Sequence, residues 1–422
     1  MMSGEWLSRA GSLGAMVAFA IGGIAVVLIS LTYAELASAM PKAGGEHVYS
    51  QRALGFGGSF VCTWALVLAY MSVTSFEAVA LPTAMGYLFP NFSQGYLWTI
   101  AGWDVTATFV GLGVAGSVVM SWVNIKGIKP AAVFQTIVTL FIMAVGIMFF
   151  AGAGVAGDVA NIDPLFVGGA VGVMGVLIMV PTMFVGFDII PQSAEEIDLP
   201  FKEIGKVLVV SVVMAVLWYV LIIFGVSMAF SEAEMAAADM VTADANAKMF
   251  GGGWAGSVLL LGGLAGILSS WNAFVLGCSR AIYAMAHSGM LPSFLGRLHP
   301  THNTPRNAIL LVGVLSCLAP FFGRPVLVWL IDAGSFSVVI AYGMVAASFL
   351  ILRKREPDMA RPYRVRHGNL VGYGALVLSV GMLFLYMPGS PAGLIWQEWL
   401  IVIAWIVLGV VLRLMASGKQ EY

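Results

Sequence analysis

The sequence predicts an all-α integral membrane protein of about eleven transmembrane helices. Of its 422 residues, 60% are hydrophobic and only 10% are charged, whereas a soluble domain carries roughly 25% charged residues. The mean hydropathy is +0.95. The apolar residues come in runs of about 20, the length with which an α-helix crosses the hydrocarbon core. A membrane β-barrel would instead show alternating segments of about ten residues.

Eleven apolar segments follow one another along the chain, and we predict that they form one transmembrane domain over residues 1–422. Several exceed the minimum length, which indicates tilted helices or extensions into water. The predicted spans are 13–37, 58–88, 101–123, 131–153, 167–190, 204–230, 254–286, 307–322, 326–352, 370–388 and 396–415.

The lysines and arginines predict the orientation. The loops after the odd-numbered spans, together with the C-terminus, hold 17 of the 20, including a cluster at 353–366. Because positive residues are retained on the cytoplasmic side, we predict a cytoplasmic C-terminus, in a multi-pass protein of the plasma membrane. The acidic segment 231–248 then faces outward. With an odd number of spans the N-terminus also lies outside, which suggests a missing upstream helix.

The composition argues against several other classes. The net charge of −1 gives no reason to expect a nucleic-acid partner. The three cysteines show no CxxC spacing, and the five histidines lie outside the spans or at their edges, so we predict neither disulfides nor a metal site. No span contains a paired catalytic constellation, so we predict no catalytic residues and no enzyme. The sequence does not indicate an oligomeric state.

Residues 181–191 are the first candidate site. Pro181 and Pro191 each remove a backbone donor, and Gly186 between them loosens the helix. A helix broken within the membrane is tolerated where protein or a water-filled cavity satisfies its backbone, and transporters build central sites in this way. Asp188 lies in this segment, where a charged residue is costly and usually functional. The alternative is an ordinary proline kink.

Glu77 and the pair Ser269 and Ser270 are the second candidate site. Glu77 lies within an apolar span, where it either carries a proton or gates, or forms a structural hydrogen bond. The two serines are either ligands for Na⁺ or bonded to their own helix carbonyls. Trp271 follows them and, with Phe184 and Phe187 of the first site, hints at an apolar-walled pocket; the alternative is that all three are packing residues.

Two other polar groups stand out. Asp332, Gly334 and Ser335 interrupt the span 326–352, as a second irregular point or an exposed cap, and we place Ser335 with the substrate-binding candidates. The acidic loop around Glu195 and Glu196 is either a solvated surface or a gate.

Three segments, in order along the chain, resemble the amino acid–polyamine–organocation permeases. They are LTYAELASAMPKAGGEHVY (31–49), FVGFDIIPQSAEEIDLP (184–200) and SRAIYAMAHSGMLPSFLGRLHPTHNTPRNA (279–308). The resemblance implies the inverted-repeat, leucine-transporter-like fold. Residues 13–153 would be the remainder of the first repeat, 167–352 the second repeat, and 370–415 two additional helices.

The resemblance also implies where a substrate would bind. The first helix of each repeat is broken in the family, and the segment around Phe184, Gly186, Phe187 and Asp188 looks like that of the second repeat. Gly186 would expose backbone amides, a phenylalanine would cover the substrate, and Asp188 would organise the turn or meet a cationic group. The first family helix has no counterpart, and GEWLSRAGSLGAMVAF looks like the loop that follows it. We expect a missing upstream segment.

The resulting hypothesis is a secondary active transporter of amino acids or related small amines, working by alternating access as a symporter or exchanger. Its partners would be the small-molecule substrate and the lipid bilayer. We expect no cofactor beyond Na⁺ or H⁺ as coupling ion. The alternative is a transport-inactive ligand-binding or regulatory membrane protein, or a truncated permease.

Overall fold

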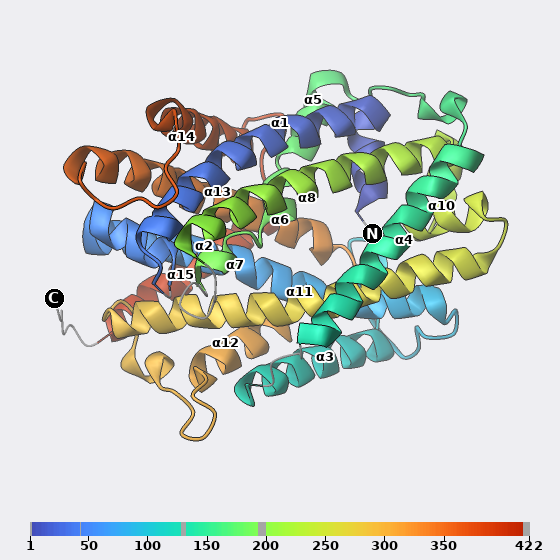
Figure 1. The fold of residues 1–422 in the computed structure, drawn as a ribbon. Coiled ribbons are helices and arrows are strands. Elements are labelled where there is room, and N and C mark those ends of the chain that lie inside the picture. The colour runs from blue at the N-terminus through green and yellow to red at the C-terminus, as the bar shows by residue number, and fades with distance from the viewer. Residues whose placement is uncertain (1, 43, 128–131, 193–199, 417–422) are drawn as a thin grey trace.

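The computed structural model describes residues 2–42, 44–127, 132–192 and 200–416, so the acidic loop around Glu195 lies outside the described residues. Long helices form a bundle around short central segments (Figure 1). Nine helices in these ranges are long and apolar enough to cross a membrane. They are α1 (Ser3–Ala39), α2 (Glu46–Leu88), α3 (Ala107–Ile125), α4 (Ala132–Ala156), α8 (Phe201–Ala229), α11 (Gly253–His287), α13 (Val326–Arg355), α14 (Gly368–Tyr386) and α15 (Trp396–Met415).

The two remaining predicted spans are helical but interrupted. Span 307–322 contains α12 (Arg306–Ser316) and a 3₁₀ turn. Span 167–190 is divided among three short helices, α5 (Gly169–Leu177), α6 (Val180–Phe184) and α7 (Ile189–Gln192). The prediction of a helical, multi-pass membrane protein is therefore confirmed, and the broken helix lies where the prolines and glycine indicated.

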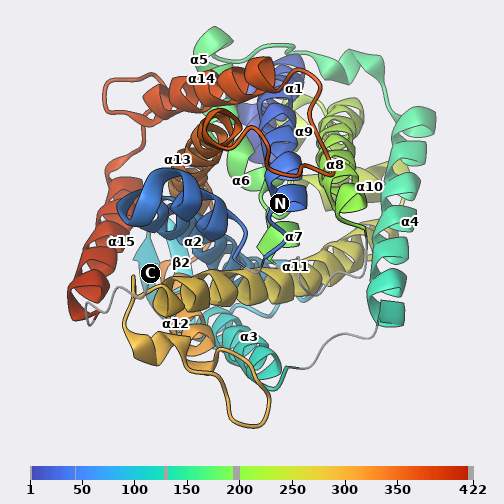
Figure 2. The same ribbon diagram turned by 60° about the vertical axis from the view of Figure 1, so that its left-hand side comes forward.

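Helices α1, α2 and α13 form the core of the bundle. In the most apolar 18-residue stretch of each of these helices, between 56% and 67% of the residues are buried. The corresponding share is 17% for α8 and 28% for α4 and α15. The outer helices expose apolar side chains such as Leu140, Leu217 and Val410, as expected of surfaces that face lipid. Figure 2 shows α4 and α15 on opposite sides of the bundle, with α6 and α7 between them.

A tryptophan pair fixes α15 to the core. The rings of Trp64 in α2 and Trp405 in α15 stack at 4.4 Å, and each indole N–H donates to the carbonyl of the other residue at 3.0 and 2.9 Å. Buried indoles usually need a partner for their N–H, and here each tryptophan supplies the other's.

The prediction that a helix begins at residue 101 is wrong. Strands β1 (Tyr96–Ile100) and β2 (Trp103–Thr106) form an antiparallel hairpin, and α3 begins only at Ala107. The turn requires positive φ angles at Ala101 (49°) and Gly102 (78°), which a helix cannot contain.

Short helices cover one end of the bundle. The acidic segment after α8 forms α9 (Glu232–Ala237) and α10 (Val241–Met249). Residues 3–10, expected to be a loop, form a helical limb of α1 instead. The limb ends at Gly11, where φ is 76° and the following amides bond to the carbonyls of Pro164 and Leu165.

The predicted interruption of span 326–352 is also wrong, because α13 is continuous. Asp332 and Ser335 are buried rather than forming an exposed cap. Gly334 instead permits close approach to α2, since a Cβ there would lie 2.8 Å from the Cβ of Ser72. The division of the chain into two repeats stays a prediction.

Candidate functional site

The central feature is the break between α6 and α7. Helix α6 ends at Phe184, α7 begins at Ile189, and Gly186 between them has φ of 131°. The Gly186 N–H donates to Asp188 Oδ1 at 2.7 Å, and the Asp188 side chain is fully buried. A carboxylate therefore holds the turn from within, by satisfying an amide that the helix ladder has released.

Helices α13 and α14 hold the other side of the break. The Thr182 N–H donates to Ser335 Oγ at 3.0 Å, and the Thr182 hydroxyl donates to the Ile331 carbonyl at 3.0 Å. The Tyr386 hydroxyl donates to the Ile178 carbonyl at 2.7 Å. Ser335, predicted to bind substrate, thus has its hydroxyl engaged with α6 and is fully buried.

Phe184 belongs to an aromatic cluster on one side of the break. Its ring packs edge-on against Tyr219 at 5.5 Å and against Phe19 at 6.1 Å. Trp6, in the N-terminal limb of α1, completes the cluster at 4.6 Å from Phe19. These aromatics connect the break to α1 and α8.

Phe187 belongs to a second aromatic cluster. Its ring lies 5.3 Å from that of Tyr33 in α1 and 5.6 Å from that of Tyr342 in α13. The two phenylalanines of the break therefore pack against different partners, and Gly186 lies between them. A rearrangement at this glycine would move both aromatic contacts.

A cavity of about 410 Å³ lies beside the break, within the ~300–1,000 Å³ typical of small-molecule sites. The break contributes Thr182, Met183 and Val185 to its wall. Among the described residues that line it, Glu77 is the only charged one. Most of the other lining side chains are apolar and include Val73, Phe76, Leu259, Ile267, Phe274 and Ile331.

The structure brings together two of the three predicted ion-coupling residues. The Ser270 hydroxyl donates to Glu77 Oε1, and both residues line the cavity. Ser269 instead accepts a hydrogen bond at 2.8 Å from Gln135 of α4. The two adjacent hydroxyls point to different helices because consecutive helical residues do not face the same way.

Trp271 lies outside this cavity. It is fully buried, and its ring packs against α3 so closely that a Cβ on Gly116 would lie 2.9 Å from it. Phe184 and Phe187 are also absent from the lining of this cavity, so the predicted pocket walled by these three aromatic side chains does not form there.

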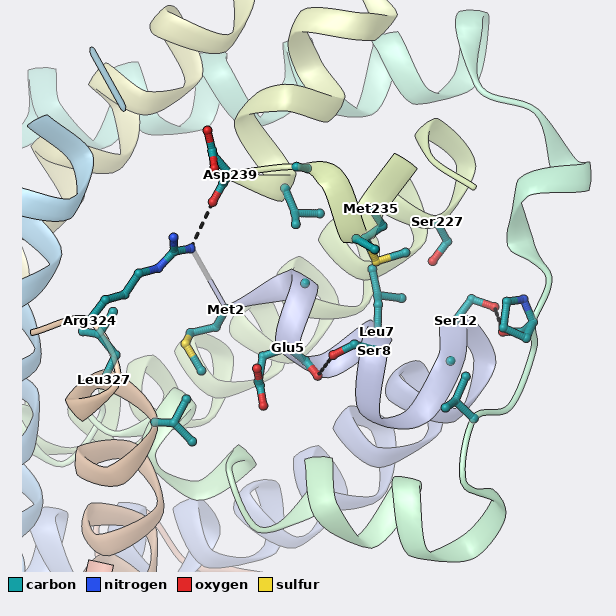
Figure 3. A pocket seen from close by; sticks show the side chains of 18 of the residues that line it. Met2, Glu5, Leu7, Ser8, Ser12, Ser227, Met235, Asp239, Arg324 and Leu327 are labelled. Carbon is teal, nitrogen blue, oxygen red and sulfur yellow. Dashed lines mark hydrogen bonds between the residues drawn. The ribbon is translucent and has the colours of Figure 1, made fainter. Parts of the chain in front are cut away.

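A second cavity of about 610 Å³ opens at the end covered by α9 and α10 (Figure 3). It shares Met2 with the cavity at the break. Figure 3 shows Arg324 reaching across to the Asp239 carbonyl, a hydrogen bond of 3.0 Å, while the limb of α1 contributes Glu5 and Ser8. Met2, at the start of α1, thus contributes to the walls of both cavities.

Sequence reasoning missed several buried polar residues. Glu46 lies in the loop predicted between the first two spans and Gln192 two residues beyond the fifth span, so neither was a candidate, yet both are fully buried. Glu35, which is 1% exposed, was missed although it lies within the predicted span 13–37. All three residues fall within the segments that resemble the permeases, and this was the available signal.

Comparisons of the sequence with known proteins point to one family. The model of the amino acid permease family matches residues 2–412. The branched-chain amino acid permease BcaP of Bacillus subtilis is 26% identical over 418 residues, which cover 97% of this chain and 86% of the relative. The methylthioribose transporter of the same organism is 23% identical over 96% of this chain and 86% of the relative. Its aspartate–proton symporter is 24% identical over 89% and 73%.

A family match over nearly the whole chain shows the class of protein. The chain belongs to the amino acid permease family, as the resemblance of its three segments implied. It is a multi-pass membrane transporter with a broken helix beside a cavity at its centre.

Proposed function

We propose that the protein is a secondary active transporter that carries amino acids or related small amines by alternating access around the break. The cavity between the broken helix and Glu77 is the observation that carries the proposal. Half-helix ends and released backbone groups are how transporters hold a charged substrate at mid-membrane. The Phe184 and Phe187 clusters would control access from the two sides.

The cavity wall favours a neutral substrate with an apolar side chain. Its lining is mostly apolar, and Glu77, the only charged residue among the described lining residues, would repel a side-chain carboxylate of the substrate. The substrates in the names of the relatives range from branched-chain amino acids to aspartate and methylthioribose. The proposal of a neutral, apolar substrate therefore rests on the cavity lining.

Counterflow in liposomes tests this proposal without assuming a coupling ion. Purified protein is reconstituted with unlabelled amino acids inside, and entry of a labelled pool is followed. We expect uptake above that of empty liposomes, with leucine and methionine competing and aspartate competing poorly. Specific ligand binding without any flux would instead favour a transport-inactive protein.

Replacing Glu77 tests how transport is driven. We expect Glu77→Gln to slow gradient-driven uptake by roughly tenfold and to spare exchange, because exchange needs no net movement of the coupling ion. Uptake under imposed Na⁺ and H⁺ gradients is compared with counterflow. Glu398→Gln, another buried acid, is the matched control and should change neither. Equal loss of both activities in Glu77→Gln would show that Glu77 binds substrate rather than couples.

The orientation and the membrane complete the proposal. The excess of lysine and arginine in alternate loops supports a cytoplasmic C-terminus in the plasma membrane. In this account the cavity of Figure 3 faces the outside, because α9 and α10, which carry the acidic outer segment, contribute to its wall. The protein moves its substrate without chemical change, so it is a carrier and not an enzyme.

A further inference from the structure

Six polar side chains gather next to the break, outside the two cavities described above. Each has a relative exposure of 0%, and four elements, α1, α2, α7 and α13, together with the α6–α7 turn, contribute them. We call this group the oxygen cluster. It consists of Tyr33, Glu46, Tyr70, Asp188, Gln192 and Tyr342.

Only part of the hydrogen-bonding capacity of the oxygen cluster is used. The Gln192 side-chain amide donates to Glu46 Oε2, and Asp188 Oδ1 accepts from the Gly186 N–H. One oxygen of each of these three side chains has no partner, namely Glu46 Oε1, Asp188 Oδ2 and Gln192 Oε1. The three tyrosine hydroxyls also have no hydrogen-bond partner. Buried polar atoms normally have partners, so six orphaned oxygens in one cluster need an explanation.

The six oxygens belong to neighbouring groups. The Tyr33 hydroxyl and Gln192 lie beside the Glu46 carboxyl, and the Tyr70 hydroxyl lies beside the Asp188 carboxyl. Glu46 and Asp188 are themselves electrostatic neighbours. None of the ion pairs between described residues includes either carboxyl. The oxygen cluster thus collects acceptors and negative charge, and no basic side chain of the described residues forms an ion pair with either carboxyl.

We propose that the oxygen cluster is a binding site for a dehydrated alkali-metal cation, for which Na⁺ is the probe. A hard cation takes oxygen ligands, and carboxylate, amide carbonyl and hydroxyl oxygens are all present. Glu46 Oε1, Asp188 Oδ2 and Gln192 Oε1 would be the principal ligands. Bound there, the cation would satisfy the orphaned oxygens and offset the carboxylate charge.

The choice of a singly charged ion rests on the proposed function. A carrier must load and release its ion in every cycle, and two carboxylates in a dry site would hold a divalent ion far more tightly. Asp188 also holds the Gly186 amide, so loading of the oxygen cluster would act directly on the turn that shapes the substrate cavity. The predicted sodium ligands Ser269 and Ser270 do not form such a site, because their hydroxyls bond to different helices.

Binding of ²²Na⁺ to the purified full-length protein tests the site without requiring transport. We expect saturable binding that choline does not displace, and a higher melting temperature in NaCl than in choline chloride. Glu46→Gln, which keeps the shape and the bond to Gln192, should weaken Na⁺ binding at least ~tenfold. Glu398→Gln is the matched control, because it neutralises a buried acid outside the oxygen cluster and should bind Na⁺ as the wild type does.

A second variant keeps the test decisive if Glu46→Gln does not fold. Tyr342→Phe removes only an unpartnered buried hydroxyl, so in choline it should be as stable as the wild type or more so. Its stabilisation by Na⁺ should nevertheless shrink. The absence of saturable ²²Na⁺ binding to the wild type, or unchanged binding in both variants, would overturn the inference. Sodium binding with the expected losses but without amino acid counterflow would uphold the site and refute the transport proposal.

Discussion

Gly186→Ala is expected to abolish most transport while leaving the protein folded. At φ of 131° a residue with a Cβ is strained by about 1–3 kcal/mol, although the space is open, since a Cβ would lie 3.6 Å from the Phe274 ring. The chain would relax by moving the Gly186 amide off Asp188, which alters the turn beside the substrate cavity. We expect at least a roughly tenfold loss of counterflow, with little change in gel-filtration behaviour.

A glycine elsewhere provides the control. Gly381 lies within α14, has no positive φ, and would place a Cβ with nothing within 4 Å. Gly381→Ala should therefore keep wild-type counterflow and stabilise the helix by up to about 1 kcal/mol. If Gly186→Ala transported as well as Gly381→Ala, the unusual backbone at the break would have no role in transport.

Glu35→Ala should have the largest effect on stability. Glu35 is 1% exposed, accepts hydrogen bonds from Arg353 at 2.8 and 2.5 Å and from the Val365 N–H at 2.8 Å, and forms an ion pair with Arg361 at 3.1 Å. Removing it leaves two largely buried guanidinium groups unpaired, which costs about 3–5 kcal/mol. These interactions join α1 to the end of α13 and to the segment that follows it. We expect poor accumulation and a much lower melting temperature of the purified protein.

An exposed ion pair on the same segment is the comparison. Arg52 and Glu356 also form a two-bond pair, at 2.8 and 2.6 Å, but their side chains are 51% and 31% exposed. Solvent screens such a pair, so Glu356→Ala should cost less than about 1 kcal/mol. A melting temperature for Glu35→Ala close to that of Glu356→Ala would contradict the account of this buried cluster.

Much of the fold was predictable because membrane helices carry their signal in local composition. The break was predictable too, since Pro181, Gly186 and Pro191 act on the backbone of their own segment. The hairpin was missed because YLWTIAGWDVT is as apolar as a helix end, and only the positive φ angles of its turn distinguish it.

The errors at the candidate site come from tertiary contacts. Gly334 was interpreted as a helix interruption, whereas it permits close approach of α13 to α2. The partners of Ser269 and Ser270 depend on which helices flank α11. The oxygen cluster combines residues far apart in the sequence, such as Glu46 and Gln192, and no local pattern reveals that pairing.

Substrate protection of a single cysteine at Val185 tests the central claim most directly. Val185 lies in the break and lines the substrate cavity. The native Cys62, Cys278 and Cys317 are first replaced by alanine, and Ser8→Cys in the cavity of Figure 3 is the control. We predict that a transported amino acid slows thiol labelling at position 185 but not at position 8. Equal labelling of Val185→Cys with and without substrate, in protein that still transports, would show that the substrate binds elsewhere.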